Sequence, residues 1–151
     1  MTYRILPFSQ LDIGTLYELL AHRQEVFVLE QGNIYPDLDG WDQKALHLLA
    51  REEDDSLMGY ARLLPAGCGY EKSGLPTFGR LAVKKAARKQ GLGGELVRRA
   101  CRWLLEESGG TEVEISAMAY LEKFYRELGF VTSSEVFDIC GVPHIMMKYH
   151  L

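Results

Sequence analysis

Three glycines fall within four positions, at Gly91, Gly93 and Gly94, in the segment KAARKQGLGGELVRRA. Glycine disfavours a helix by about 1 kcal/mol relative to alanine, yet the residues that follow repeat with helical spacing. One apolar stripe is formed by Leu92, Leu96, Val97, Ala100 and Leu104. A strand candidate, residues 77–83, precedes the glycines. The segment therefore predicts a strand, a turn with bare backbone, and a helix that packs on a sheet along one side.

Two common nucleotide-binding patterns are excluded at this turn by their spacing. A Rossmann fingerprint needs a third glycine where Leu96 stands, and a P-loop needs lysine and a hydroxyl residue where Glu95 and Leu96 stand. What remains is Arg-x-x-Gly-x-Gly, formed by Arg88, Gly91 and Gly93. Backbone N–H groups at such a helix N-terminus can hold phosphates. The alternative is a flexible, solvated turn.

The rest of the chain alternates strands and helices. Apolar patterns predict strands over 2–8, 45–52, 57–65, 77–83, 111–117, 130–139 and 143–150. Helical spacing predicts helices over 11–31, 91–108 and 119–128, with Asp12 as the first N-cap. Gly109 and Gly129 follow the last two helices as stop signals. We expect a single domain, residues 1–151, of the α/β or α+β class.

Composition limits the partners and the cellular compartment that we expect for this protein. The net charge of −4 gives no general attraction to nucleic acid, so an anion site must be local. Cys68, Cys101 and Cys140 are far apart and odd in number, and four scattered histidines have no partnered cysteine, so we expect neither disulfides nor a metal site. No signal peptide or membrane span is apparent. We expect the protein to lie in the cytoplasm. We expect it to be a monomer or homodimer and to bind neither membrane nor nucleic acid.

The ordered motifs resemble a known superfamily. Their order resembles the GNAT superfamily of acyl-CoA-dependent N-acyltransferases. It runs from a strand through Arg-x-x-Gly-x-Gly, a helix and another strand to Phe-Tyr-x-x-x-Gly-Phe (124–130). Within this superfamily the chain is most similar to the ElaA family, in three segments: RQEVFVLEQGNIYPDLDGWD, GRLAV and VPHIMM. The resemblance covers nearly the whole chain. It implies a mixed, twisted sheet with helices on both faces and a V-shaped opening between the strands that hold Leu81 and Ile115.

The resemblance also implies the cofactor and its binding residues. Acetyl-CoA would place its pantetheine in the opening, along the edge of the GRLAV strand. Its pyrophosphate would lie on the backbone amides after that strand. The implied contacts are Leu81, Ala82, Val83, Arg88, Lys89, Gln90, Gly91, Leu92, Gly93, Gly94 and Phe124.

In GNAT enzymes the tyrosine of the Phe-Tyr pair often protonates the departing thiolate, and this role falls on Tyr125. The same residue could instead belong to the core stripe of its helix. Met118 stands where many members have an asparagine, so no asparagine contact to the cofactor is carried over. A backbone N–H near Leu81 would stabilise the oxyanion. The general base is open between Glu30, His47 and His144.

The acceptor side is expected in the acidic loop after the first helix. Carboxylates and aromatic rings suit a cationic amine, and a solvated acidic turn is the alternative. Arg62 and Arg80 lie among apolar neighbours, and could pair with the loop carboxylates or bind a carboxylate on the substrate. The candidate substrate-binding residues are Gln31, Tyr35, Asp37, Asp39, Arg62 and Arg80.

Three functions are compatible with these features. The first is an acetyl-CoA-dependent N-acetyltransferase acting on a primary amine of a small molecule or peptide. The second is a non-catalytic acyl-CoA-binding or sensor domain, since a fold does not fix a function. The third is an acyltransferase that moves a longer acyl group to an amino-acid-derived metabolite. Tyr125 favours an enzyme, and the compact chain favours acetyl over longer groups.

Overall fold

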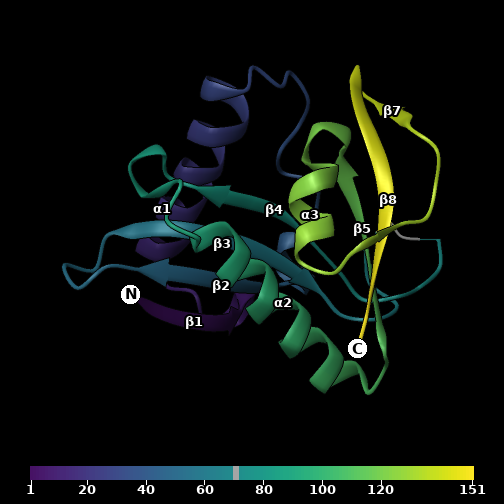
Figure 1. The fold of residues 1–151 in the computed structure, drawn as a ribbon. Helices are drawn as coiled ribbons and strands as arrows, with labels where there is room; N and C mark the ends of the chain where they lie inside the picture. The colour runs from purple at the N-terminus through teal and green to yellow at the C-terminus, as the bar shows by residue number, and fades with distance from the viewer. Residues whose placement is uncertain (70–71) are drawn as a thin grey trace.

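The computed structural model describes residues 1–69 and 72–151 (Figure 1). The strands are β1 (Thr2–Pro7), β2 (Leu46–Arg51), β3 (Leu57–Leu64), β4 (Thr77–Val83), β5 (Glu112–Met118), β6 (Val131–Thr132), β7 (Phe137–Ile139) and β8 (Val142–His150). The helices are α1 (Ile13–Gln24), α2 (Leu92–Ser108) and α3 (Glu122–Glu127). No helix in the described ranges is long and apolar enough to cross a membrane.

The strands form two four-stranded sheets. The first has the order β1-β2-β3-β4, and the second has the order β5-β8-β6 with β7 also paired to β8. Every paired neighbour within each sheet is antiparallel. The sheets meet where the N–H of Glu114 donates to the carbonyl of Pro76 at 3.1 Å. This bond lies near the start of both β4 and β5, and the two strands then diverge (Figure 1). The expected V-shaped opening is therefore present.

Helices cover both faces of the first sheet, as expected. On β2, Leu48 packs with Leu96 of α2, whereas the next residue, Leu49, packs with Leu19 of α1. This alternation is what a strand produces when both of its faces are covered. The fold class predicted from the sequence is confirmed.

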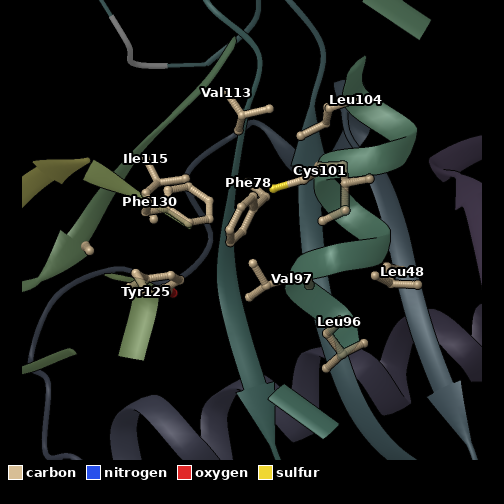
Figure 2. Close-up of a cluster of buried hydrophobic side chains, with 14 of the residues drawn as sticks. Leu48, Phe78, Leu96, Val97, Cys101, Leu104, Val113, Ile115, Tyr125 and Phe130 are labelled. Atoms are coloured by element: carbon tan, nitrogen blue, oxygen red, sulfur yellow. The ribbon is translucent and has the colours of Figure 1, made fainter. Parts of the chain in front are cut away.

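An aromatic cluster joins the two sheets beneath the opening. Phe78 of β4 lies against Phe130 in an edge-to-face arrangement, with 6.1 Å between ring centroids. Tyr125 of α3 contacts both rings, and Ile115 of β5 lies beside them (Figure 2). Such aromatic pairs add stability beyond the area that they bury. The cluster fixes α3 against β4 and so positions the site described below.

Most predicted elements are confirmed, and three differ in extent. The helix predicted over 11–31 ends at Gln24, and its continuation is a wider π-helix, Glu25–Glu30. The helix predicted over 119–128 begins as a 3₁₀ turn, so α3 is short. The strand predicted over 130–139 is divided into β6 and β7, both of which pair with β8. Between β3 and β4, where the sequence also predicts a loop (residues 66–76), residues 70 and 71 lie outside the described residues.

The predicted caps are also present. The Asp12 carboxylate accepts the N–H of Thr15 at 2.7 Å, which is an N-cap bond at the start of α1. Gly109 ends α2 in the left-handed conformation with φ +65°, and its N–H donates to Leu105. These bonds satisfy terminal backbone groups that a helix leaves unpaired.

Candidate active site

The glycine-rich turn presents unpaired backbone amides at the start of α2. No N–H group from residue 89 to residue 94 makes a hydrogen bond of ordinary geometry within the described part of the chain, and the first helical bond runs from Glu95 to Gly91. Gly91 has φ +81°, a conformation that side chains disfavour, and a Cβ there would meet only open space. The turn therefore needs glycine for its backbone shape. Its amides can receive an anion.

Arg88 stands beside these amides, and Glu30 holds it there. The Glu30 carboxylate lies 2.7 Å from the Arg88 guanidinium, whose Nε also donates to the carbonyl of Val83 at 2.9 Å. Arg88 is thus tied to the end of β4, at the edge where pantetheine is expected. Glu30 was a candidate base, but the structure places it in this ion pair and outside the lining of the cavity described below.

A β-bulge interrupts β4 where it faces that opening. Tyr60 pairs with Ala82 and Arg62 pairs with Gly79, so the single residue Ala61 lies opposite both Arg80 and Leu81. Arg80 has φ +52°, which is unusual for a residue other than glycine. β4 is also the outer strand of its sheet. The bulge leaves backbone groups at Arg80 and Leu81 outside the regular ladder, where they can face a ligand.

Ion pairs join the acidic loop to three arginines. Asp37 contacts Arg23 and Arg80 at 2.9 and 2.8 Å. Asp39 contacts Arg62 and Arg80 at 2.7 and 3.1 Å. Asp42 contacts Arg23 and Arg62 at 2.7 and 3.1 Å. The six residues Arg23, Arg62, Arg80, Asp37, Asp39 and Asp42, called the arginine–aspartate ring below, carry equal numbers of positive and negative charges.

The ring changes the interpretation of the acceptor loop. The carboxylates of Asp37 and Asp39 are occupied by arginines rather than unpaired and ready for a cationic amine. The ring of Trp41 is likewise covered by the ammonium of Lys44, which lies 5.2 Å from its centre. Of the two roles considered for Arg62 and Arg80, the pairing with the loop carboxylates is the one present. The ring fixes the loop against β3 and β4.

A cavity of about 900 Å³ opens between the two sheets. Its walls include Gln31, Tyr35 and Asp39 from the acidic loop, and Arg62, Arg80 and Leu81 from β3 and β4. On the other side it is lined by Tyr125 and by residues of β5 and β8, among them Glu114, Ser116, Met118, His144, Met146 and Lys148. The cavity therefore brings most of the predicted catalytic and substrate residues together. Asp37 lies behind its wall, in the ring.

Tyr125 is a lining residue of the cavity, and its phenol is protonated. Burial raises the pKa of its phenol, so the group keeps its proton at neutral pH. Its ring packs against Phe124 and Phe130 at centroid distances of 5.0 and 5.5 Å. No hydrogen-bond partner for its hydroxyl is present in the described ranges. Tyr125 thus belongs both to the core, through its ring, and to the cavity.

His144 offers a ring nitrogen with a free lone pair. Its Nδ1 lies 2.8 Å from the carbonyl of Val142, and since a carbonyl only accepts, Nδ1 must carry the proton. In the neutral ring the lone pair is then on Nε2, for which no partner occurs among residues 1–69 and 72–151. His144 lines the cavity. This tautomer is the one that a general base requires at Nε2.

His47, the other histidine considered, is used internally. Its Nδ1 lies 2.7 Å from the hydroxyl of Tyr60, and its Nε2 lies 2.9 Å from the carbonyl of Asp42. The side chain is fully buried, and burial lowers its pKa. It does not line the cavity. Of the three candidates for the base, only His144 faces the cavity.

Comparison with known proteins assigns the family. The model of the acetyltransferase (GNAT) domain family matches residues 22–151. The chain belongs to the GNAT acetyltransferase family. A Synechocystis UPF0039 protein is 38% identical over 144 residues, which are 95% of this chain and 92% of that protein. The GNAT domain and the structural neighbours described next make the chain an acyltransferase.

Two solved structures are similar over nearly the whole GNAT chain. An acyl-CoA N-acyltransferase from Pseudomonas aeruginosa superposes with a TM-score of 0.88 at 35% identity, covering 98% of both chains. Escherichia coli ElaA superposes with a TM-score of 0.87 at 32% identity, covering 99% of this chain and all of that chain. The resemblance to GNAT proteins, and to ElaA in particular, is confirmed. GNAT enzymes of this kind use acyl-CoA and act on amines of small molecules or peptides.

Some residues of this GNAT site were not identified from the sequence. Arg23 is a member of the ring, and a charged residue within an apolar helical stripe is the signal that could have revealed it. Glu114, Ser116 and Lys148 line the cavity, although polar residues alternating along a strand ordinarily indicate a solvated face. Within the described residues, no group of three or more metal-binding side chains is placed to hold a metal ion.

Proposed function

We propose that this protein is an acetyl-CoA-dependent N-acetyltransferase that moves the acetyl group directly to a primary amine in the cavity. The observation that carries this proposal is that one cavity holds both Tyr125 and His144 and reaches Leu81, at the edge of β4 that leads to the amides of the glycine turn. An acyl donor along that edge and an amine in the cavity would meet between the two side chains.

The cofactor fits the residues that would hold it. Pyrophosphate would be bound by the unpaired amides of residues 89–94 and by Arg88. Pantetheine would lie along Leu81, Ala82 and Val83, beside Phe124. When bound, acetyl-CoA supplies an acetyl group already activated as a thioester. Positioning this group beside the amine provides much of the rate.

Two residues are proposed to move the protons of the reaction, His144 from the amine and Tyr125 to the sulfur. The amine nitrogen forms a bond to the acetyl carbon as the carbon–sulfur bond breaks. His144 Nε2 receives the proton of the amine, and the Tyr125 hydroxyl donates a proton to the departing sulfur. The backbone N–H groups at the bulge, near Leu81, stabilise the negative charge on the carbonyl oxygen. Gln31 and Tyr35 line the acceptor side of the cavity.

A longer acyl group is the second candidate, and the size of the cavity favours it. About 900 Å³ exceeds what an acetyl group and a small amine occupy. The cavity end near Glu114 and Lys148 is charged, however, and an alkyl chain there would exclude water from the Lys148 ammonium, which makes no hydrogen bond within the described ranges. This polar end favours acetyl as the transferred group and a larger acceptor.

Acetylation assays test the proposal. A panel of amines, amino acids and peptides is incubated with acetyl-CoA, and release of the free thiol is followed. We expect at least one amine to be acetylated. His144→Gln should lower kcat about 10²–10⁴-fold without weakening acetyl-CoA binding. His150→Gln is the matched control, because His150 lies on the same strand but outside the cavity. If kcat falls equally in both variants, or falls in neither, His144 is not the general base.

A further inference from the structure

The cavity is elongated along the second sheet. Its floor consists of three successive cross-strand pairs of β5 and β8: Met118 with His144, Ser116 with Met146, and Glu114 with Lys148. The first pair lies at the open end of the V, next to Leu81 and Tyr125. The last pair lies four residues away, which in a strand is about 13 Å. An acceptor that fills this cavity must therefore be long.

The far end of the cavity is polar and lies where β4 and β5 meet. Glu114 is buried, and its carboxylate accepts a hydrogen bond from Ser73 at 2.8 Å. Lys148 approaches the other oxygen of Glu114 at 3.9 Å, which is an ion pair too long for a hydrogen bond. Glu114 is thus largely satisfied by its neighbours.

Lys148, in contrast, has unused hydrogen-bonding capacity. An ammonium group carries three N–H donors, and Lys148 makes no hydrogen bond within the described ranges, although its side chain is only 32% exposed. Lys72, which is exposed, also lines this end and has no ion-pair partner in the part of the chain that the structure describes. Among residues 1–69 and 72–151, two lysines and one glutamate line this end, so its unmatched charge is positive.

The middle of the cavity separates the two ends with apolar surface. Met146 lies there, together with the buried Oγ of Ser116, which lacks a partner in residues 1–69 and 72–151, and Leu64 follows toward the far end, opposite Thr77. An apolar segment would cover the side chains of Met146 and Leu64, and a polar atom in that segment could pair with Ser116.

We infer that the acceptor is an elongated amine whose opposite end carries a carboxylate, bound by Lys148 with support from Lys72 at the end of the cavity where β4 and β5 meet. This rests on the proposed acetyl transfer and names the class of its acceptor. The carboxylate would receive the unused N–H donors of Lys148, while the amine lies about 13 Å away beside His144. An ω-amino acid or a short peptide with a terminal carboxylate has this form.

Three matched series of acceptors test the inference. They are unbranched ω-amino carboxylates, diamines and monoamines, each over chain lengths that bracket the floor of the cavity. Thiol release gives kcat/KM, and calorimetry gives the affinity of each compound for the protein with coenzyme A bound. We expect the carboxylates of matching length to exceed the monoamines about ten-fold or more in both measurements, as one charge-assisted hydrogen bond provides.

Variants of Lys148 locate the carboxylate. In Lys148→Met, the ratio of kcat/KM for the carboxylates to kcat/KM for the monoamines should be close to one. In Lys148→Arg, most of the preference for carboxylates should remain. Lys123→Met is the matched control, because Lys123 is 89% exposed in its side chain and lies outside the cavity. It should keep the wild-type ratio.

The possible outcomes separate this inference from the proposed function. Acetylation of amines without any preference for carboxylates would overturn the inference and leave the transfer intact. A preference for diamines that disappears in Glu114→Gln would overturn it in favour of a cation at the far end. If acetyl-CoA binds but no acceptor in any series is acetylated, both the transfer and the inference are wrong.

Discussion

The guanidinium Nε of Arg80 lies 2.8 Å from Oδ1 of Asp37, and this contact anchors a residue whose own backbone is strained. Arg80 has φ +52° at the bulge of β4, next to Leu81. A residue other than glycine loses roughly 1–2 kcal/mol in this conformation. The ion pairs with Asp37 and Asp39 offset that cost. They thus link the acceptor loop to the backbone at the centre of the site.

Two substitutions at Arg80 separate the strain from the ion pairs. Arg80→Ala keeps the strained backbone and removes the guanidinium, whereas Arg80→Gly removes both. Because glycine adopts positive φ freely, we expect stability to follow the order wild type, Gly, Ala, with about 1 kcal/mol between the two variants. Urea denaturation measures this order. An alanine variant as stable as the glycine variant would show that the bulge stores no strain.

The arginine–aspartate ring predicts a loss of stability in acid. Burial alone would raise the pKa of Asp42, but hydrogen bonds and ion pairs with Arg23 and Arg62 lower it further than burial raises it. The pKa of Asp39 is lowered in the same way, chiefly by Arg62 against the effect of burial. A carboxyl group with a lowered pKa stabilises the fold above its unfolded pKa of about 3.9. That contribution is lost as the pH falls through the folded pKa.

Urea unfolding at a series of pH values checks this. The free energy of unfolding of the wild type should decline below about pH 4, as the carboxylates take up protons. Asp42→Asn should be less stable than wild type at neutral pH, and the two curves should converge in acid. Parallel curves would mean that the Asp42 charge contributes nothing to the pH dependence.

The amides of the glycine turn can be tested one at a time at Gly93. Gly93→Pro removes an N–H in the first turn of α2, where proline is tolerated. Gly93→Ala keeps the N–H, and its Cβ would lie 3.5 Å from the ring of Phe124, an ordinary contact. Calorimetry should show acetyl-CoA binding weakened about ten-fold by proline, as for one lost charge-assisted bond, and much less by alanine. Equal affinities in two folded variants would exclude this amide from the phosphate site.

Tyr125 is predicted to matter for turnover and not for stability. Its hydroxyl has no partner in the described ranges, so Tyr125→Phe leaves no buried group unsatisfied and preserves the aromatic cluster. We expect kcat to fall about 10²–10⁴-fold if proton transfer to sulfur limits the rate. The thermal midpoint should stay close to wild type. Wild-type turnover in this variant would restrict Tyr125 to the core.

Sequence patterns predicted those features that depend on local spacing. The amphipathic stripe of α2, the Asp12 cap and the Gly91 turn each follow from residues close together in the chain. The division of residues 130–139 into β6 and β7 was missed, because an apolar run does not show where its pairing with β8 lapses. The π-helix Glu25–Glu30 was missed for a similar reason: its wider turn buries Val26 and Phe27 against Ala82 of β4.

The site was predicted less completely than the fold, because its charges are settled by partners distant in sequence. The sequence left open whether Asp37 and Asp39 bind a cationic amine or pair with Arg62 and Arg80. In the structure both carboxylates lie in ion pairs with arginines, including Arg23. The roles of the histidines could not be distinguished from the sequence either. His47 and His144 have similar strand contexts in the sequence, and only the hydrogen bonds of each ring distinguish a buried structural group from one with a lone pair facing the cavity.

The roles proposed for His144 and Tyr125 depend on transfer of an acetyl group from acetyl-CoA to an amine. The most direct test of this transfer measures two products in one reaction: the free thiol, and the acetylated acceptor identified by mass spectrometry with isotopically labelled acetyl-CoA. We expect both products to form in equal amounts and the label to be found on the acceptor nitrogen. Thiol release without acetylated amine, or acetyl-CoA binding without either product, would contradict the proposed transfer.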